Sequence, residues 1–342
     1  MEDITKIKQI VAEAKEIAPD FTYKPLTSGH INKTYLIQNN NEKLVLQKLN
    51  TTVFENLDAI TQNILNVSNH LKNKTYPHTI LQPIVFNDGA YLYDLKWRMF
   101  EYIEDTQTFL KVQSTQQAFE AARFLSFFHA HISDIAIKDI QDPIEGFLDF
   151  EKRLHQYEQA LQIASKKRLQ EAHKAISYIN DNKFILQKWI MLMPQLPTRI
   201  IHADPKISNF LFDKEDANKI IALIDWDTIL CGSVLYDFGD MVRSYTNLKE
   251  EDDPKAGNNF SLENYRALEE GFLYHLKDIL TIKEIENLAL GAKTVIYVQA
   301  MRFLTDFLND DVYYAIQHPK QNLDRTMSQI NLLKDMQEKL AD

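Results

Sequence analysis

The stretch IIHADPKISNFLFD, residues 200–213, holds a cluster of polar side chains between two apolar runs. Such apolar brackets predict a loop between two buried elements, and binding and catalytic groups concentrate on loops that a rigid scaffold holds. Within the loop, Asp204 and Asn209 have four residues between them. A carboxylate that orients a hydroxyl and an amide oxygen that binds a hard cation are groups used in phosphoryl transfer.

A second carboxylate pair, Asp225 and Asp227, ends the apolar run IIALIDWD. Side chains alternate between faces in an extended chain, so both aspartates are expected to point one way and Trp226 the other. Two carboxylates on one side of a strand end form a seat for a hard cation such as Mg²⁺. Together with Asn209, they predict a metal site that neutralises phosphate oxygens.

The remaining polar residues of the loop take supporting roles in this chemistry. Lys206 is placed to donate to the migrating phosphoryl group, and His202 to brace the loop by hydrogen bonds. Asp204 needs no raised pKa, because the hydroxyl proton leaves late in a loose transition state. A single Asp or Asn in a turn usually only caps backbone. The prediction of a catalytic centre therefore rests on the conjunction of H-x-D-x-K-x-x-N, a hairpin and D-x-D.

The composition fits an ordinary globular protein and excludes several classes. The chain has 342 residues, enough for two domains or one two-lobed unit, of which 45% are hydrophobic and 25% charged. A net charge of −10 argues against a duplex nucleic-acid partner, which usually requires a basic face. Cys231 is the single cysteine, so neither an intramolecular disulfide nor a cysteine zinc cluster can form.

The N-terminal residues carry helical apolar spacing interrupted by acids and lysines, and no signal-peptide run is present. No segment approaches the length of a transmembrane helix. We therefore expect a cytoplasmic protein without a membrane partner. The sequence gives no indication of oligomeric state.

The elements that position these residues differ between the two ends of the chain. Residues 1–103 alternate strand-like runs with one helix, over 53–71, which predicts a small, mostly antiparallel sheet with a packed helix. Residues 104–342 are mainly helical, and Ser114 with Gln117 forms a capping-box pattern. Strands are expected at 21–26, 34–38, 43–49, 84–86, 90–94, 97–103, 209–212 and 220–224, and helices at 4–17, 147–163, 167–179, 184–193 and beyond 265.

HADPKISN resembles the catalytic loop of the protein-kinase-like superfamily, and IDWDTILCGSVLYDFGDMVR is similar to the matching motif of aminoglycoside phosphotransferase and choline kinase-like enzymes. SGHINKTYLI, WRMFEYIEDTQTF and AMRFLTDFLNDDVYYAIQHPKQNLDRTMSQINLLKDM extend the likeness over nearly the whole chain, toward the bacterial N-acetylhexosamine 1-kinases. The resemblance implies a two-lobed α+β fold with ATP and Mg²⁺ in the cleft. Residues 1–103 would form the β-rich nucleotide-binding lobe, and 104–342 the helical catalytic and substrate-binding lobe.

The resemblance also implies roles for the central residues. Asp204 takes the place of the catalytic aspartate, Asn209 and Asp225 those of the Mg²⁺ ligands, and Asp227 that of a further carboxylate of the metal site. Asp237 would brace the catalytic loop, although an exposed acid at a helix start gives the same pattern. This chain departs from the subgroup at Ala203, Pro205, Ser208 and Cys231, and none of these changes removes a charged catalytic group.

The nucleotide end is less specific. The segment TSGHINKTY holds one glycine, and an ordinary hairpin loop would look the same. The strand residue that contacts the phosphates is either Gln47 or Lys48, since alternation sends the two to opposite faces. The helix glutamate that would pair with such a lysine has no clear counterpart. The candidate nucleotide-binding residues are Ser28, Gly29, His30, Asn32, Gln47, Lys48 and the hinge residues Glu101, Tyr102 and Ile103.

The acceptor end is expected on the helical lobe below Asp204. In the resemblance, Arg302 and Tyr313 match positions near the bound hexosamine, and Arg243 is a weaker candidate. An alternative for Arg302 is a surface ion pair with Asp306, four residues later on the same helix face. Planar donors and aromatic faces suit sugar hydroxyls and an acetamido group.

The leading hypothesis is therefore a kinase that transfers the γ-phosphoryl group of ATP to a sugar hydroxyl, with the anomeric hydroxyl of an N-acetylhexosamine favoured. A kinase for an aminoglycoside, an amino alcohol or another sugar is the first alternative. A pseudokinase-like module that binds nucleotide without turnover is the second. A metal-dependent hydrolase is a weaker third, because the ten histidines are scattered.

Overall fold

The computed structural model describes residues 4–14, 21–26, 32–39 and 42–341. The chain divides into two compact units that are each discontinuous in sequence. The first unit comprises residues 1–108, 134–145 and 208–230, and the second comprises 109–133, 146–207 and 231–342. The sequence predicted one break near residue 103, whereas two short later segments also belong to the first unit.

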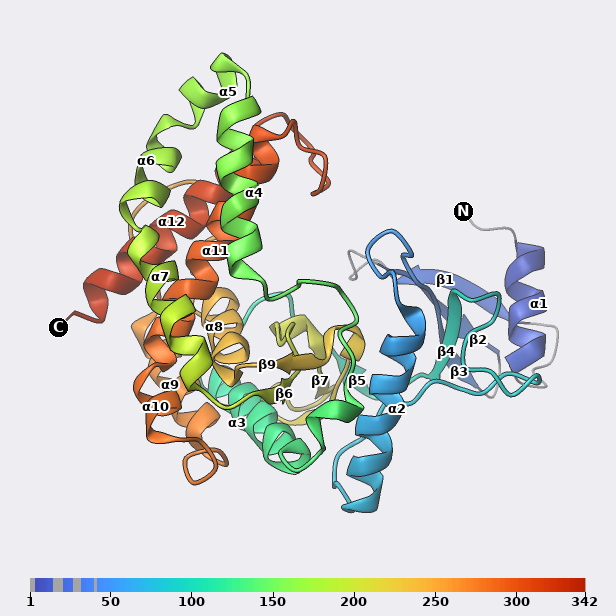
Figure 1. The fold of residues 1–342 in the computed structure, drawn as a ribbon. Helices are drawn as coiled ribbons and strands as arrows, with labels where there is room; N and C mark the ends of the chain where they lie inside the picture. The colour runs from blue at the N-terminus through green and yellow to red at the C-terminus, as the bar shows by residue number, and fades with distance from the viewer. Residues whose placement is uncertain (1–3, 15–20, 27–31, 40–41, 342) are drawn as a thin grey trace. The chain divides into compact units, whose positions relative to one another are not determined.

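A four-stranded antiparallel sheet dominates the first unit, in the order β1 (Thr22–Leu26), β2 (Lys33–Gln38), β3 (Lys43–Lys48) and β4 (Trp97–Glu101). Helix α1 (Ile4–Ala14) lies against this sheet (Figure 1), because its apolar positions share one face and pack on buried strand residues such as Leu46. The strand register places Thr34, Gln47 and Arg98 side by side on three neighbouring strands, where they form a row of polar residues.

Helix α2 (Leu57–Asn73) begins at Asn56, whose side chain accepts a hydrogen bond from the Ala59 N–H and so caps the helix. Its buried Asn63 exchanges hydrogen bonds with the backbone of Gln141 and donates to the Ile229 carbonyl. The Asn63 side chain thus links α2 to the segment after the short helix η1 (Ile137–Asp139) and to the residue after η4 (Trp226–Thr228).

A three-stranded sheet completes the first unit, with β5 (Thr106–Gln107), β7 (Phe210–Asp213) and β8 (Ile220–Leu223) in that order. Strands β7 and β8 form the antiparallel hairpin that the sequence predicted. Beyond the last strand pair, the Ile224 N–H donates to the Asn209 carbonyl at 2.9 Å. The hairpin therefore holds the residues before β7 and after β8 side by side.

Helices make up nearly all of the second unit. Helix α3 (Thr115–Ile132) begins at Ser114, whose hydroxyl accepts from the Gln117 N–H, while the Gln117 side chain accepts from the N–H of Gln113. The other described elements are α4 (Phe150–Ile163), α5 (Lys166–Glu171), α6 (His173–Asp181), α7 (Lys183–Leu192), η2 (Met193–Gln195), β6 (Arg199–Ile201), η3 (Ile207–Asn209), β9 (Leu230–Gly232), α8 (Val234–Tyr245), α9 (Leu262–Leu273), α10 (Ile282–Glu286), α11 (Leu288–Leu308) and α12 (Gln321–Lys339).

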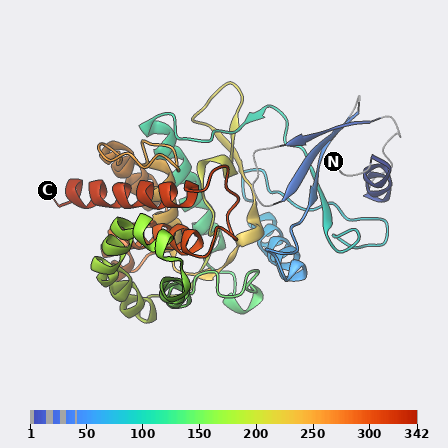
Figure 2. The ribbon, with the colours of Figure 1, turned by 90° about the horizontal axis from the view of Figure 1, so that it is seen from above.

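Helix α11 lies at the centre of this unit, with α8, α4 and α12 packed around it (Figures 1 and 2). Helices α8 and α11 approach so closely that a Cβ on Gly239 would lie 2.8 Å from the carbonyl oxygen of Gly291. Glycine is required on both sides of this crossing, since a Cβ on Gly291 would lie 2.6 Å from the Leu235 oxygen. The crossing fixes the polar residues of α8 relative to those of α11.

The α+β architecture matches the prediction, and two local expectations were wrong. Residues 84–86 and 90–94 form no strands, although the Phe86 N–H donates to Ala90 across the predicted turn. Phe86 packs into the sheet core instead of pairing along a partner strand. The helix expected at 167–179 breaks at Ala172 into α5 and α6. Among the described residues, no helix is long and apolar enough to span a membrane.

Candidate active site

The loop after β6 is held from beneath by Asp237, which is fully buried in the first turn of α8. Its two carboxylate oxygens accept hydrogen bonds from the backbone N–H groups of His202 and Ala203, at 2.8 and 2.7 Å. The His129 ring of α3 lies 2.9 Å from the same carboxylate. These bonds hold Ala203 at φ 65°, a left-handed conformation that costs free energy for a residue with a Cβ.

Asp237 thus holds the backbone of the loop after β6, and it is a buried residue, not an exposed acid at a helix start. Sequence reasoning missed His129, its partner from α3. A histidine on an apolar helix gives no signal by itself, because most such residues are ordinary core histidines. His202 is also fully buried, and its Nδ1 accepts a hydrogen bond from the Asp204 N–H. His202 therefore shapes the loop.

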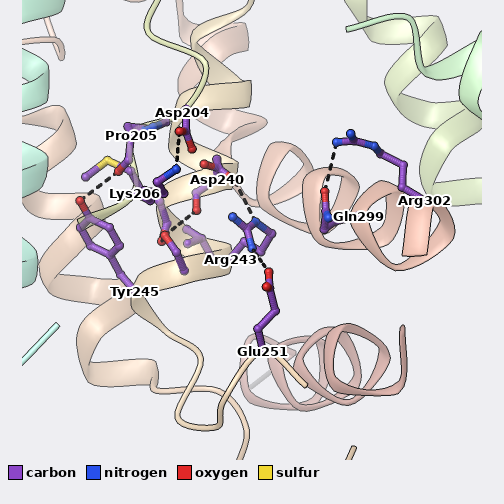
Figure 3. Close-up of polar contacts among 12 residues, drawn as sticks. Asp204, Pro205, Lys206, Asp240, Arg243, Tyr245, Glu251, Gln299 and Arg302 are labelled. Carbon is purple, nitrogen blue, oxygen red and sulfur yellow. Dashed lines mark hydrogen bonds and ion pairs between the residues drawn. The ribbon is translucent and has the colours of Figure 1, made fainter. Parts of the chain in front are cut away.

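Asp204 presents its carboxylate at the edge of this braced loop, with a quarter of its side chain exposed. The Lys206 ammonium lies 2.7 Å from Oδ2 of Asp204 (Figure 3). The Tyr245 hydroxyl of α8 donates to the carbonyl of Pro205, which ties down the residue between them. Asp204 and Lys206 therefore flank a residue whose carbonyl group is held by α8.

Arg243, the weaker acceptor candidate, is engaged by acids. Its Nε donates to Asp240 at 2.8 Å, and its Nη1 lies 3.4 Å from the Glu251 carboxylate (Figure 3). Burial raises the pKa of Asp240, an effect that Arg243 opposes and the nearby Asp204 carboxylate reinforces. Burial lowers the pKa of Arg243, but Asp240 and Glu251 outweigh burial and leave it raised. Arg243 compensates a buried acid beside Asp204.

A second cationic region lies on α11. The Arg302 guanidinium is 6.0 Å from the ring centre of Tyr313 and 5.8 Å from that of Tyr314, and its Nη1 donates to Gln299 at 3.3 Å. Tyr236 of α8 connects this region to the loop. Burial raises the pKa of Tyr236, with Asp240 and Asp204 acting in the same direction and Arg302 and Arg243 in the opposite one.

Asp306 does not serve as the ion-pair partner of Arg302. It is buried, and its carboxylate accepts from the backbone N–H groups of Tyr313 and Tyr314, at 2.8 and 2.9 Å. The amide of Asn322 donates to the same carboxylate at 2.8 Å. Asp306 therefore orders the segment after α11 and places the two tyrosine rings beside Arg302.

Asn209 and Asp225, the proposed metal ligands, lie at the two ends of the β7–β8 hairpin in the first unit. Asn209 is buried, and the backbone hydrogen bond from Ile224 to Asn209 brings the residue before Asp225 against it. Asp225 adopts φ 63° and ψ 55°, and Trp226–Thr228 then form a 3₁₀ turn. The alternation expected of an extended chain is therefore wrong here, because the backbone bends at Asp225.

Asp227 is buried in an ion pair that the sequence did not indicate. Arg98 Nη1 lies 2.6 Å from Oδ1 of Asp227, and Nη2 donates to Oδ2 at 2.8 Å. The Asn32 amide donates to Oδ2 as well, at 2.9 Å. Gln47 completes the group, since its Oε1 accepts from Nε and Nη2 of Arg98. Both oxygens of Asp227 thus have protein partners.

Arg98 was overlooked because WRMFEYIED predicts a strand core and a hinge, and a lone arginine in a strand has no periodic signal. Lys48 lies on a different side of β3 from Gln47, with its ammonium 5.3 Å from the Trp97 ring centre. The structure thus separates the two candidates, as alternation requires. Ser28, Gly29 and His30 lie outside the described residues.

The candidate hinge residues lie at the end of β4 and directly after it. Glu101 is exposed at the end of the strand, and the Tyr102 N–H donates to the Lys43 carbonyl at 3.1 Å. The Ile103 carbonyl accepts from the Thr106 hydroxyl at 2.8 Å. Asn32 directly precedes β2. Its side-chain oxygen accepts a hydrogen bond from the Asn50 N–H, which fixes the start of that strand.

The donor set at the hairpin ends fits Mg²⁺. Asn209 supplies an amide oxygen and Asp225 a carboxylate, which are hard ligands. No group of three or more His, Cys, Asp or Glu residues suited to a metal ion occurs within the described part of the chain. Mg²⁺ is commonly bound by only one or two protein groups together with nucleotide phosphates and water, so a set of two ligands fits such a site.

A model of the phosphotransferase enzyme family, APH, matches residues 22–270, and the chain belongs to this family. Solved structures share its fold. A microcompartment-associated aminopropanol kinase aligns with a TM-score of 0.65 at 15% identity, covering 99% of this chain and 98% of that one. A spectinomycin phosphotransferase bound to ADP and spectinomycin gives 0.63 at 11% identity, over 97% and 96%. Choline kinase from Cryptosporidium parvum Iowa II gives 0.57 at 15% identity, over 99% and 97%.

Family membership defines the general activity. The protein is a small-molecule phosphotransferase that acts on a hydroxyl group, and its cofactors are ATP and Mg²⁺. The predicted protein-kinase-like superfamily and two-lobed α+β fold class are thereby confirmed.

Proposed function

We propose that the protein transfers the γ-phosphoryl group of ATP to a sugar hydroxyl, the anomeric hydroxyl of an N-acetylhexosamine being favoured. The observation that carries this proposal is the group formed by Arg302, Tyr313, Tyr314 and Tyr236, which belongs to the same unit as Asp204. Planar donors and aromatic faces suit a pyranose ring with an acetamido substituent. The proposal places the enzyme in the cytoplasm, where ATP is supplied.

In this proposal Asp204 orients the acceptor hydroxyl and receives its proton as the bond to phosphorus forms. Lys206, held against Asp204, donates to the migrating phosphoryl oxygens. The bonds from Asp237 to His202 and Ala203 keep the carboxylate in position without motion during transfer. These residues require only the geometry of the second unit.

Asn209 and Asp225 are the residues we assign to Mg²⁺, which when bound neutralises charge on the β- and γ-phosphates. Asp227 receives a different role from the one proposed from the sequence. Its carboxylate is bound by Arg98, so we assign it to positioning the segment that carries Asp225.

The nucleotide contacts proposed from the sequence stay as predictions. Gln47 orients Arg98, and Lys48 lies over Trp97, so neither residue has the environment of a conventional phosphate-binding lysine. We propose that backbone groups of the segment around Ser28, Gly29 and His30 contact the phosphates. The hinge Glu101–Ile103 is proposed to pair with adenine through its backbone. The Tyr102 N–H already donates to Lys43 and the Ile103 carbonyl already accepts from Thr106, so fewer of its backbone groups can bind adenine than the sequence suggested.

The test is an acceptor panel. The purified protein is incubated with ATP, Mg²⁺ and a set of hexoses, N-acetylhexosamines, aminoglycosides and amino alcohols, and ADP release is followed by a coupled assay. We expect turnover with an N-acetylhexosamine, and phosphorus NMR of the product should show an anomeric phosphate. Turnover only with amines would replace the sugar assignment by an amine kinase. Nucleotide binding without turnover on any acceptor would support a pseudokinase-like module.

A further inference from the structure

We propose that Arg153 and Arg302 together form a subsite that binds acceptor oxygen atoms and rejects ammonium groups, so that the acceptor is a neutral or anionic sugar. The inference rests on the proposed sugar-kinase function and adds Arg153 as a second residue that determines specificity.

Arg153 lies on α4 and has an unusual environment. Its Nη1 donates to the neutral Gln156 side chain at 3.1 Å, while its Nε is buried without a hydrogen-bond partner among the described residues. Arg302 likewise bonds to neutral groups, the Gln299 amide and the Tyr313 side chain, and lies over two tyrosine rings. By contrast, the half-buried or buried Arg98, Arg168, Arg199 and Arg243 all pair with carboxylates.

The charge of Arg302 acts on the Arg153 guanidinium. Burial lowers the pKa of Arg153, the positive charge of Arg302 lowers it further, and Tyr313, Tyr314 and Tyr236 oppose that shift. Two desolvated like charges with only neutral hydrogen-bond partners destabilise the unliganded fold. Such an arrangement is typical of sites where a ligand supplies the missing acceptors.

The position of Arg153 connects it to the catalytic loop. Phe150, one turn earlier on α4, packs against the Tyr236 ring with centroids 6.1 Å apart. Tyr236 in turn feels the charges of both Asp204 and Arg302. The four cations of this region, Lys206, Arg243, Arg153 and Arg302, outnumber its three acids, Asp204, Asp240 and Glu251, which leaves an excess of one positive charge. We place the subsite on α4 and α11, in the same unit as Asp204.

Guanidinium groups donate in a planar fork to carbonyl, hydroxyl or carboxylate oxygens, and they accept nothing. An ammonium group on the acceptor would meet two fixed cations, and repulsion of this kind is the usual basis of charge exclusion. The similar structures include an aminopropanol kinase, a spectinomycin phosphotransferase and a choline kinase, and all three of these acceptors carry an amine or a quaternary ammonium group. We infer that this chain has changed its acceptor class within the same fold.

The experiment uses three acceptors that share one ring: N-acetylglucosamine, which is neutral, its C6 uronic acid, which is anionic, and glucosamine, which is cationic. We expect the unaltered enzyme to use the first two and to discriminate against glucosamine in kcat/KM. Arg153→Gln should reduce that discrimination about tenfold or more, chiefly through KM, because one charged hydrogen-bond donor is lost. Arg153→Lys, which keeps the charge, should retain discrimination against glucosamine.

Arg325→Gln is the matched control, since Arg325 is also half-buried, bonds only to the neutral Asn322 side chain and the Ala315 carbonyl, and lies over the Phe303 ring. It should leave the acceptor ratios unchanged. Thermal unfolding should show Arg153→Gln to be as stable as the unaltered protein, because a buried charge without a carboxylate partner is removed.

Three outcomes would contradict these expectations and can be told apart. Turnover with acceptor ratios unchanged in a folded Arg153→Gln variant would overturn the role of Arg153. If the unaltered enzyme used glucosamine as well as N-acetylglucosamine, the exclusion of ammonium groups would be wrong whether or not the variants fold. Lack of turnover with all three sugars would instead overturn the proposed sugar-kinase function.

Discussion

Buried charges in this protein are of two kinds, and one example from each unit shows the difference. In the first unit, Asp227 is 2% exposed in its side chain, and each of its oxygens meets Arg98, which Gln47 then orients. In the second unit, Asp204 pairs with Lys206 and has a quarter of its side chain exposed, and Arg153 and Arg302 have no carboxylate partner among the described residues. We propose that matched charges maintain the fold, whereas the arginines without a carboxylate partner bind substrate.

Asp204→Asn tests the incompletely matched side of this comparison and has the largest expected effect. Removing the group that receives the hydroxyl proton should lower kcat about 100- to 10,000-fold. ATP affinity, measured by calorimetry, should remain, and the thermal midpoint should change little because Asp204 is partly exposed.

Asp213→Asn is a close control for that experiment. Asp213 is exposed to a similar extent, 23% against 25%, and also pairs with a lysine, Lys219, at 2.8 Å. It should retain full turnover. Equal losses in the two variants would show that a carboxylate with a lysine partner is generally required, and would remove the special role of Asp204.

Arg98→Met tests the matched side. It leaves the buried Asp227 carboxylate without its cation, which should lower the free energy of unfolding by about 3–5 kcal/mol in urea titrations. The double variant Arg98→Met with Asp227→Leu should recover much of this loss, since no buried charge is left uncompensated. A single variant as stable as the unaltered protein would contradict the view that this pair maintains the fold.

Arg302→Gln should show the opposite pattern, with binding affected and stability spared. Loss of a charged donor to the acceptor should raise the acceptor KM about tenfold to a hundredfold, while the KM for ATP stays the same. The thermal midpoint should not fall, because the described residues include no carboxylate that would lose its ion-pair partner when Arg302 is replaced. A destabilised variant with an unchanged acceptor KM would assign Arg302 to the fold instead.

The pair Arg199–Glu284 extends the comparison to a matched charge of the second unit and should give the smallest effect. Burial raises the pKa of Glu284, but the hydrogen bonds from Arg199 and Thr281 outweigh burial and leave it below its ordinary value of 4.5. The pair therefore stabilises the fold above that value and loses this contribution as the pH falls through the lower pKa of the folded state.

Unfolding measured between neutral and acidic pH should accordingly show stability falling below about pH 4.5. Glu284→Gln should be less stable at neutral pH and should show a shallower dependence on acid than the unaltered protein. An identical acid dependence in both proteins would show that other carboxylates dominate this pH range.

The candidate motif residues stand out in the sequence because they occur at short local spacings, and their roles stay predictions. Asp204 and Asn209 share one loop, and the brace Asp237 lies in a recognisable helix start. Asp227 shows the limit of that reasoning. Alternation assumes extended backbone, and the left-handed Asp225 with the following 3₁₀ turn breaks it.

Other partners depend on tertiary pairing that no local pattern records. Arg98 meets Asp227 because β4 and the segment after β8 come together in the first unit, although the two residues are far apart in sequence. Arg153 resembles any solvated arginine of an amphipathic helix until α4 packs on α11. The strands expected at 84–86 and 90–94 fail for a similar reason, because Phe86 finds a better partner in the sheet core.

The hairpin that joins Asn209 to Asp225 has a consequence for how such enzymes are recognised and altered. The two residues are joined through the backbone bond between Asn209 and Ile224, while the turn at 214–218 lies at the opposite end and is largely exposed. Extra residues inserted there would leave the ligand ends undisturbed. A search pattern that demands a constant separation between the asparagine and the aspartate would overlook lengthened relatives, and the same turn is a suitable place to attach a fluorescent label.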